Sequence, residues 1–232
     1  MQFQWFYDLR DLFFPNFCAA CEQHPPLGNE VLCLQCRNRL PQTAMHRMPE
    51  NRFTDRFFGR VYLQTGAALY HFREGNGVQQ LIHRLKYGNR PQLGQALGRY
   101  YGRMLREEKI YADIDLIIPV PLHPIRERQR GYNQSDWFAK GLAETMQRPH
   151  LSDGLRRTKH SKSQVRKSAT ERLTTMLNAF EVNRQRMLRG RHVLLVDDVL
   201  TTGATLEACA SQLLKLPGTK VSMATIAIAG AV

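Results

Sequence analysis

The segment Val193–Thr205, with the sequence VLLVDDVLTTGAT, restricts the possible folds of this 232-residue chain more than any other stretch. Its first residues, Val193–Val196, form a continuous apolar run, which is typical of a strand buried on both faces in a parallel sheet. Asp197 and Asp198 follow at the carboxyl end of that strand, where open α/β sheets bind their ligands. A helical pattern then begins near Ala204. The segment therefore predicts a strand, a ligand-binding loop and a helix in succession.

Strand-like and helical patterns alternate along the rest of the chain. Strands are predicted at Val61–Leu63, Ala67–Phe72, Asp115–Val120, Val193–Asp197 and Lys220–Ala229. Helices are predicted at Val78–Lys86, Leu93–Arg106, Gln134–Met146, Thr170–Leu177 and Ala204–Lys215. This alternation indicates an α/β domain with a mostly parallel sheet flanked by helices. No apolar run reaches the roughly 18–20 residues of a membrane span, and the N-terminus lacks the basic region of a signal peptide, so we expect a cytoplasmic protein.

The segment that joins the predicted strand at Val193–Asp197 to the predicted helix at Ala204–Lys215 offers two kinds of chemistry. A helix N-terminus presents free backbone N–H groups and the positive end of the helix dipole, and both suit a phosphate. Gly203 lets the backbone approach such a ligand closely. The carboxylates of Asp197 and Asp198 would repel a phosphate, but they accept hydrogen bonds from sugar hydroxyls. A ribose 5-phosphate satisfies both halves, and acids that merely cap the helix are the alternative.

Cysteine spacing predicts a second site near the N-terminus. Two Cys-x-x-Cys pairs are formed by Cys18, Cys21, Cys33 and Cys36. Two such pairs can bring four sulfurs to one metal, which indicates a structural Zn²⁺ site with no open coordination position. A disulfide framework, one redox-active pair and His24 as a replacement ligand are the alternatives. The fifth cysteine, Cys209, falls on the apolar side of a predicted helix, where we expect a core residue.

The net charge of +13 is unevenly distributed. Residues 1–50 carry four Lys or Arg and five Asp or Glu, so the basic excess lies in residues 51–232. We therefore expect a four-cysteine zinc-binding segment over 1–50 and the α/β domain over 51–232. A basic excess of this size suggests polyanionic partners such as nucleic acid or phosphorylated small molecules, with a solvated basic surface as the alternative.

Several motifs together resemble a known family. The pattern VLLVDDVLTTGAT matches the phosphoribosyl diphosphate (PRPP) binding motif of type I phosphoribosyltransferases. With the four cysteines, LIHRLKYGNR (81–90) and IIPVPLHPIRERQRGYNQS (117–135), the chain resembles the phosphoribosyltransferase-like ComF family, close to its GntX-like DNA-utilisation branch. The resemblance covers nearly the whole chain. It implies a zinc ribbon joined to a type I phosphoribosyltransferase-like domain, and an association with competence and the uptake or use of extracellular DNA.

The same resemblance implies roles for individual residues. Asp197 and Asp198 would hold the ribose hydroxyls of PRPP, which would bind with Mg²⁺. The 5-phosphate would be wrapped by Thr201, Thr202, Gly203, Ala204 and Thr205.

Basic residues supply the candidate catalytic groups. Arg126 and Arg130 follow a predicted core strand, which suits a diphosphate-binding loop because guanidinium groups grip phosphate oxygens. That loop is usually shorter and richer in small residues in salvage phosphoribosyltransferases. Lys162 and Arg166 belong to an irregular basic segment that also holds Arg156 and Arg157 and would close over PRPP, clamp a nucleic-acid backbone or remain solvated. Lys86 and Tyr87 would add a cation and a stacking surface, or simply pack.

Two functions remain open on this basis. In the first, a PRPP-binding protein with a structural zinc site acts in the uptake or use of extracellular DNA, with single-stranded DNA and DNA-uptake machinery proteins as partners. In the second, the protein is an active salvage-type phosphoribosyltransferase that modifies a nucleobase or nucleotide-related acceptor and does not contact DNA. The motif indicates the class of ligand and leaves the reaction open.

Overall fold

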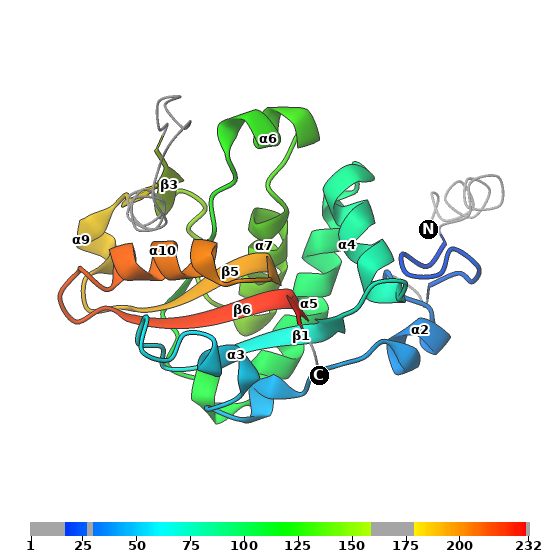
Figure 1. Cartoon of the computed structure of the whole chain (residues 1–232), viewed down its shortest axis with the longest axis horizontal. Coiled ribbons are helices and arrows are strands. Elements are labelled where there is room, and N and C mark those ends of the chain that lie inside the picture. Colours follow the sequence, from blue (N-terminus) through cyan, green and yellow to red (C-terminus); the bar gives the residue numbers. More distant parts are fainter. Residues whose placement is uncertain (1–16, 27–29, 159–178, 231–232) are drawn as a thin grey trace, which may run out of the picture.

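A four-stranded parallel sheet forms the centre of the computed structural model, which describes residues 17–26, 30–158 and 179–230. The strand order is β1-β6-β5-β2, and every neighbouring pair is parallel (Figure 1). The strands of this sheet are β1 (Gly66–Phe72), β2 (Leu116–Pro119), β5 (His192–Leu200) and β6 (Lys220–Ala229). A separate antiparallel pair is made by β3 (Leu155–Arg157) and β4 (Phe180–Val182). The predicted α/β fold with a mostly parallel sheet is confirmed.

Helices surround this sheet, and Figure 1 shows α5 and α7 behind the strands. They are α2 (Leu34–Arg39), α3 (Arg52–Asp55), α4 (Gly77–Tyr87), α5 (Pro91–Glu107), α6 (Pro124–Arg130), α7 (Gln134–Met146), α9 (Gln185–Leu188) and α10 (Ala204–Leu213). Short 3₁₀ turns occur at Met45–Arg47 and Lys109–Tyr111. None of the helices in the described part of the chain is long and apolar enough to cross a membrane.

Local sequence explains where the main helices begin and how closely they pack. Asn76 and Asn133 cap α4 and α7 by accepting hydrogen bonds from Gln79 N and Ser135 N, each at 3.1 Å. Helices α5 and α7 approach so closely that a Cβ on Gly98 would lie 2.2 Å from a backbone oxygen of α7. Only glycine fits such a crossing, and the crossing holds α7 firmly behind the sheet.

The central strand β5 is apolar on both faces. All of Val193–Val196 is fully buried, as expected for a strand covered by helices on both sides. Burying each such side chain contributes roughly 1.5–3 kcal/mol relative to leaving it exposed. The residues that follow this run are therefore fixed to a rigid part of the fold.

Most of the predicted elements are confirmed within a few residues, and α7 and β6 have the predicted bounds. The strand predicted at Val61–Leu63 is wrong. Val61 N instead closes a turn by donating to Phe57 O at 3.0 Å, and Tyr62 is 75% exposed. The helix predicted at Thr170–Leu177 lies outside the described residues, as does the basic segment from residue 159 onward.

The cysteine segment packs against α4 (Figure 1). Arg84 of α4 donates hydrogen bonds to the carbonyl oxygens of Cys18 and Ala19. The same guanidinium forms an ion pair with Glu22, with an N–O distance of 2.9 Å. Side chains of Cys18, Ala20 and Leu32 join the hydrophobic core of the larger domain. The boundary predicted near residue 50 stays a prediction.

Candidate functional site

Asp197 and Asp198 lie at an open edge of the sheet. Strand β2 ends at Pro119, which pairs with Val196, whereas β5 and β6 stay paired as far as Leu200. The sequence suggested that the acids lie where β5 ends, but the structure places both of them inside β5. Because β2 has already ended, their side chains face a cleft of about 350 Å³ at the carboxyl edge of the sheet.

Asp197 is held by two hydrogen bonds. Its Oδ1 atom accepts from Ser135 Oγ and from the backbone N–H of Asp198, each at 2.8 Å. Burial and the negative charge of Asp198 nevertheless raise the pKa of Asp197 to about 7, although these hydrogen bonds and Lys86 oppose the change. Asp197 thus changes charge near neutral pH.

Asp198 has a different partner. Its carboxylate lies 3.1 Å from Nζ of Lys86, the penultimate residue of α4. Both side chains are mostly buried, so solvent screens this ion pair less than it screens a surface pair. The structure therefore gives Lys86 a place in the same cleft as the two acids.

The loop after β5 forms a cradle at the N-terminus of α10. Gly203 has φ of 83°, a left-handed conformation that favours glycine, and no side chain caps α10 at that position. The predicted phosphate-binding residues surround a recess of about 40 Å³, lined among others by Thr201, Thr202, Gly203, Ala204 and Thr205. Thr202 Oγ1 accepts from Ala204 N at 3.4 Å, and the other backbone N–H groups at this helix N-terminus suit a phosphate. The structure brings together all seven residues assigned to PRPP.

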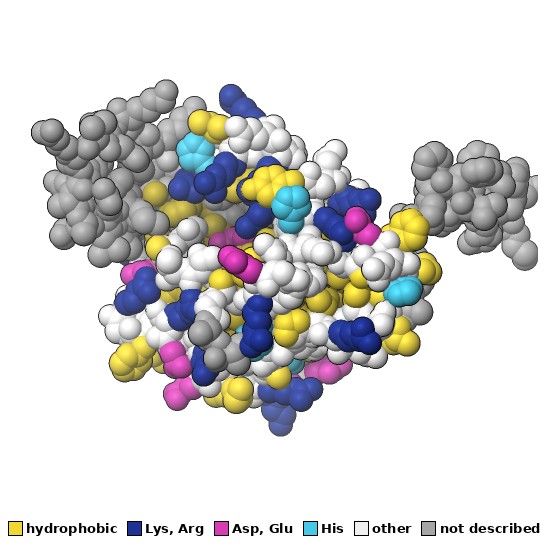
Figure 2. Space-filling model, turned by 45° about the vertical axis from the view of Figure 1, so that its right-hand side comes forward, with side chains coloured by type: hydrophobic (Ala, Val, Ile, Leu, Met, Phe, Trp, Pro, Cys, Tyr) yellow, Lys and Arg dark blue, Asp and Glu magenta, His cyan; other side chains and the backbone are white. Residues whose placement is uncertain are grey.

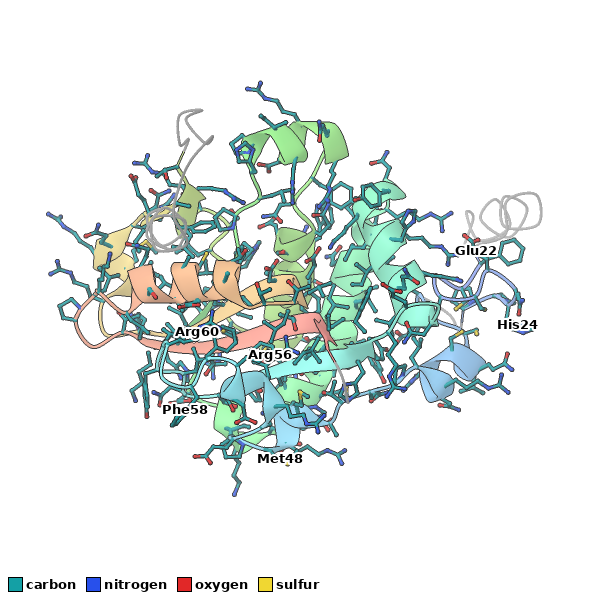
Figure 3. All side chains as sticks on the ribbon, in the orientation of Figure 1. Glu22, His24, Met48, Arg56, Phe58 and Arg60 are labelled. Atoms are coloured by element: carbon teal, nitrogen blue, oxygen red, sulfur yellow. The ribbon has the colours of Figure 1, made fainter. Side chains whose placement is uncertain are left out.

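A short segment after α3 braces this cradle from outside (Figure 3). The guanidinium of Arg56 donates to the backbone oxygens of Thr201 and Ala229. Arg60 forms an ion pair with Glu207, which lies in the first turn of α10. Together with Phe57, which packs where a Cβ on Gly203 would lie, these contacts fix the cradle before any ligand arrives. Sequence reasoning missed this brace, because nothing in residues 56–60 reveals which distant backbone they contact.

The predicted diphosphate loop after β2 is wrong in form, because residues 124–130 form the helix α6. Pro124 occupies its first turn, and Nδ1 of His123 accepts from Ile125 N at 3.2 Å as a cap. Gly131, with φ of 78°, ends the helix. These are ordinary start and stop signals that the arginine pattern obscured.

Helix α6 still directs both predicted arginines to the cleft. Arg126 and Arg130 line it together with Arg157 of β3. Burial and the nearby positive charge of Arg126 lower the pKa of the Arg157 guanidinium. The side chain of Arg126 has no hydrogen-bonded or ion-paired partner among the described residues. An anion bound between Arg126 and Arg157 would relieve the repulsion between their charges.

Two adjacent arginines in β3 have different positions. Arg156 is bound to Glu181 of β4, with Nε 2.8 Å from a carboxylate oxygen, whereas Arg157 points to the cleft and lies over the ring of Phe180. Strand alternation would have separated them, but three residues were too few to predict β3. The remaining candidates, Lys162 and Arg166, lie outside the described residues.

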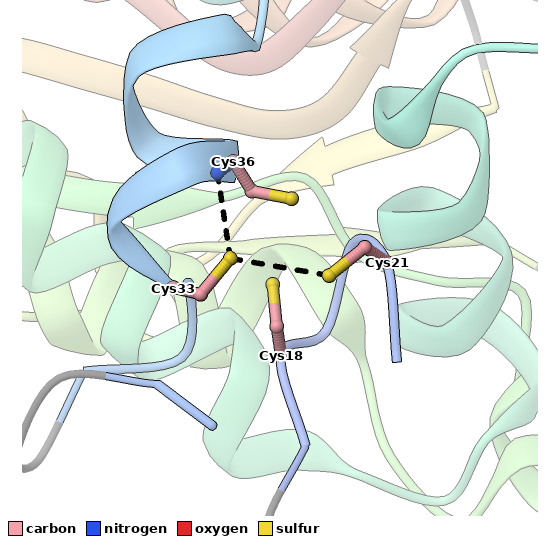
Figure 4. A group of neighbouring side chains, drawn as sticks. All are labelled: Cys18, Cys21, Cys33 and Cys36. Atoms are coloured by element: carbon pink, nitrogen blue, oxygen red, sulfur yellow. Dashed lines mark hydrogen bonds between the residues drawn. The ribbon is translucent and has the colours of Figure 1, made fainter. Parts of the chain in front are cut away.

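The four cysteines converge as their spacing predicts (Figure 4). Their sulfur atoms all lie within 4.8 Å of one another, and the sulfurs of Cys21 and Cys33 are 3.9 Å apart. A tetrahedral site with Zn–S bonds of about 2.3 Å needs sulfurs about 3.8 Å apart. The backbone amides of Ala20 and Cys36 donate to the sulfurs of Cys18 and Cys33, each at 3.4 Å. The four sulfurs therefore fit a zinc-sized ion.

The thiols of the cluster differ in how readily they ionise. Burial opposes ionisation of Cys21, but the backbone amides of Gln23 and His24 outweigh it and lower its pKa to about 6. Burial and the neighbouring sulfurs raise the pKa of Cys36. Metal ligation needs deprotonated thiols, so binding of a metal ion by these four sulfurs would release protons.

The acidic edge offers a weaker metal site. Among the described residues, the cysteines are the only group of three or more side chains arranged to hold a metal. Mg²⁺ is commonly bound by one or two carboxylates together with substrate phosphates. Asp197 and Asp198 thus fit Mg²⁺ only in company with a phosphorylated ligand.

Comparisons with known proteins agree with this geometry. Residues 135–231 match the family model described as phosphoribosyl transferase domain. The chain is 30% identical over 215 residues to Competence protein F of Haemophilus influenzae, covering 88% of this chain and 93% of that protein. It is 34% identical over 207 residues to DNA utilization protein YhgH of Escherichia coli K12, covering 86% and 85%. Competence protein ComFC of Bacillus subtilis is 25% identical over 202 residues, covering 81% and 79%.

Proposed function

The chain belongs to the ComF family of competence and DNA-utilisation proteins, and on that premise we propose that it binds PRPP in the cleft beside β5 and acts in the uptake or use of extracellular DNA. One observation carries the ligand assignment. The two acids, the threonine cradle and the unpaired guanidinium of Arg126 converge on a single edge of the sheet. A ligand with hydroxyls between two phosphate-bearing ends matches that order of groups.

Each part of PRPP has a counterpart in the cleft. Asp197 and Asp198 accept hydrogen bonds from the ribose hydroxyls, and the backbone and hydroxyls of Thr201–Thr205 hold the 5-phosphate. Arg126, Arg130 and Arg157 hold the diphosphate. Mg²⁺, bound through the diphosphate, supplies further positive charge. The hydroxyls must share Asp198 with the ammonium group of Lys86.

The cysteine cluster holds a structural Zn²⁺ in this proposal. Four thiolates saturate its coordination, which leaves no position for a substrate or a water. The cysteines are all free thiols in the structure, and thiolate ligation suits the reducing cytoplasm.

Calorimetry with Mg²⁺–PRPP tests the ligand assignment. Replacing both acids (Asp197→Ala with Asp198→Ala) removes two charged hydrogen-bond acceptors, so we expect affinity to fall about 100-fold or more. The control is Asp153→Ala, which removes an exposed acid outside the cleft and should leave affinity unchanged. Undetectable binding to folded, metal-loaded wild type would refute the proposal.

Direct contact with single-stranded DNA, and with proteins of the uptake machinery, is the second part of the proposal. The basic excess of residues 51–232 supports the DNA contact, because Lys and Arg release counterions from a phosphate backbone. A DNA titration at increasing salt should show affinity falling steeply. Negligible binding at the lowest salt would leave the alternative, a salvage-type transferase without DNA contact, which release of diphosphate from PRPP in the presence of nucleobases would identify.

A further inference from the structure

A second cleft opens beside the first, between the end of α4 and helix α6. Its volume is about 720 Å³. Figure 2 shows Lys and Arg side chains around a recess in the upper part of the molecule. The residues that line this outer cleft are Lys86, Tyr87, Asn89, Arg126, Arg128, Gln129, Arg130 and Gly131.

The charge of the outer cleft is entirely positive. No Asp or Glu is among its lining residues, and Lys86 already contacts Asp198 in the inner cleft. Arg126 and Arg128 have no hydrogen-bonded or ion-paired partner in the described part of the chain. Uncompensated guanidinium groups on a concave surface favour a phosphate, which they can bind through two N–H groups at once.

The outer cleft also offers an aromatic surface. Tyr87 is 67% exposed. The centroid of its ring lies 5.0 Å from the centroid of the His83 ring and 5.4 Å from Cζ of Arg130. An exposed tyrosine beside cations is suited to stacking against a flat, electron-rich ring. The side-chain amides of Asn89 and Gln129 supply donors and acceptors for the edge of such a ring.

The two walls of the outer cleft are fixed relative to each other. Tyr132, just after α6, donates its hydroxyl to Leu85 O near the end of α4 at 2.6 Å. Arg130 is anchored by Gln134 Oε1 at 2.9 Å. The aromatic surface and the free arginines therefore face each other across a preformed gap.

We propose that the outer cleft binds a nucleoside phosphate, with its base stacked on Tyr87 and its phosphate held by Arg126 and Arg128. A free nucleotide and a nucleotide unit of single-stranded DNA share this chemistry. For a nucleotide unit of DNA the proposal rests on the proposed DNA contact, and for a free nucleotide it goes beyond the proposed function. Tyr87 and Arg128 do not line the inner cleft, so the outer cleft can be occupied without PRPP. The shared residues Lys86, Arg126 and Arg130 place the nucleotide next to the ribose-binding acids.

Binding of AMP and of a short oligothymidylate to the metal-loaded full chain tests this site. Replacing Tyr87 (Tyr87→Ala) should weaken binding about tenfold, because stacking on one aromatic side chain is worth roughly 1–3 kcal/mol per base. Arg128→Gln should weaken it about threefold to tenfold and reduce its dependence on salt. If the two variants weaken the binding of AMP, the ligand is a free nucleotide. If they weaken only the binding of oligothymidylate, the ligand is DNA.

Matched controls exist elsewhere on the surface. Tyr62 is 75% exposed, and Tyr62→Ala should change neither affinity. Arg186, like Arg128, is an exposed arginine in the last turn of a short helix, and Arg186→Gln should have no effect. Binding that is absent in wild type, or that Tyr87→Ala leaves intact, overturns the outer site.

Mg²⁺–PRPP affinity separates failure of this site from failure of the proposed function. Arg128→Gln should leave it unchanged, because Arg128 does not line the inner cleft. If wild type binds AMP but not PRPP, the outer site stands and the proposed function fails.

Discussion

The cysteine cluster and the acidic edge of the sheet both place chemically alike groups close together. The two sites differ in which groups of the protein stabilise the neighbouring carboxylates or sulfurs. At the acidic edge, the protein itself supplies the compensation. Ser135 donates to Asp197, and Lys86 pairs with Asp198. At the cysteine cluster, backbone amides donate to the sulfurs, among them those of Ala20 and Cys36.

This difference follows from the elements that carry each site. The acids extend from β5, whose preceding residues Val193–Val196 are fully buried, and their partners come from α4 and α7, which are packed on the same core. The cysteines lie on a short segment, and the one regular element in its described residues is the six-residue helix α2. We infer that the sheet builds the acidic site before ligand arrives, whereas the cysteine segment needs its metal to be built.

Removing the metal should produce the largest effect. Zinc binding to a four-thiolate site supplies on the order of 10 kcal/mol or more, which a segment of this size cannot replace by packing. A strong chelator, or Cys21→Ser, should therefore expose the amides of Ala20 and Cys36 to fast hydrogen exchange while β5 stays protected. The measurement is hydrogen exchange together with metal content.

A different cysteine provides the control for this prediction. Cys209 is fully buried in α10, away from the cluster, and Cys209→Ala should keep the metal. Unchanged protection of the Ala20 and Cys36 amides in metal-free protein would mean that packing against α4 alone orders the segment.

An intermediate effect is expected at Asp197. Its pKa is about 7 in the folded protein and about 3.9 in an unfolded chain. The folded state therefore holds the proton more tightly, so the free energy of unfolding of wild type falls as pH rises from about 4 to about 7. Asp197→Asn removes this titration, and its advantage over wild type should grow by on the order of 2 kcal/mol between pH 5 and pH 8.

Denaturant unfolding at several pH values measures that difference. Asp153→Asn is the control, because its exposed ion pair with Arg184 is worth less than about 1 kcal/mol. A constant difference in the free energy of unfolding between Asp197→Asn and wild type across this range would show that burial and the charge of Asp198 do not raise the pKa of Asp197.

The sequence predicted the parts of both sites that are local. The Cys-x-x-Cys spacing and the order of acids, threonines and glycine each lie within one short segment, and the structure brings the members of each group together. Strand β5 and helix α7 were predictable because their apolar periodicity is long and consistent.

What escaped prediction depends on contacts between distant segments. Ser135 appeared only as the second residue of a helix, although its hydroxyl holds Asp197 across 62 positions of sequence. Arg157 could not be separated from Arg156 without knowing that β3 pairs with β4. Helix α6 was hidden because three arginines in seven residues suggested a loop, whereas Pro124 and Gly131 marked its ends.

The smallest effect is expected from the brace that fixes the phosphate cradle. The guanidinium of Arg56 donates to the backbone oxygens of Thr201 and Ala229, so Arg56→Gln should loosen the cradle without unfolding the sheet. Losing one charged hydrogen-bond donor at this position should weaken ribose 5-phosphate and Mg²⁺–PRPP about threefold to tenfold. Affinity for inorganic diphosphate should stay the same, because the arginines proposed to hold it lie on α6 and β3, whereas Arg56 donates to the loop after β5 and to the end of β6.

Phe58 is the matched control, since it lies in the same segment and is 90% exposed (Figure 3). Phe58→Ala should change none of these affinities. If Arg56→Gln lowers the free energy of unfolding but leaves ribose 5-phosphate affinity intact, the contact serves only stability. If ribose 5-phosphate is weakened selectively, the cradle is a site that the fold builds in advance, and its contrast with the metal-dependent cysteine segment holds.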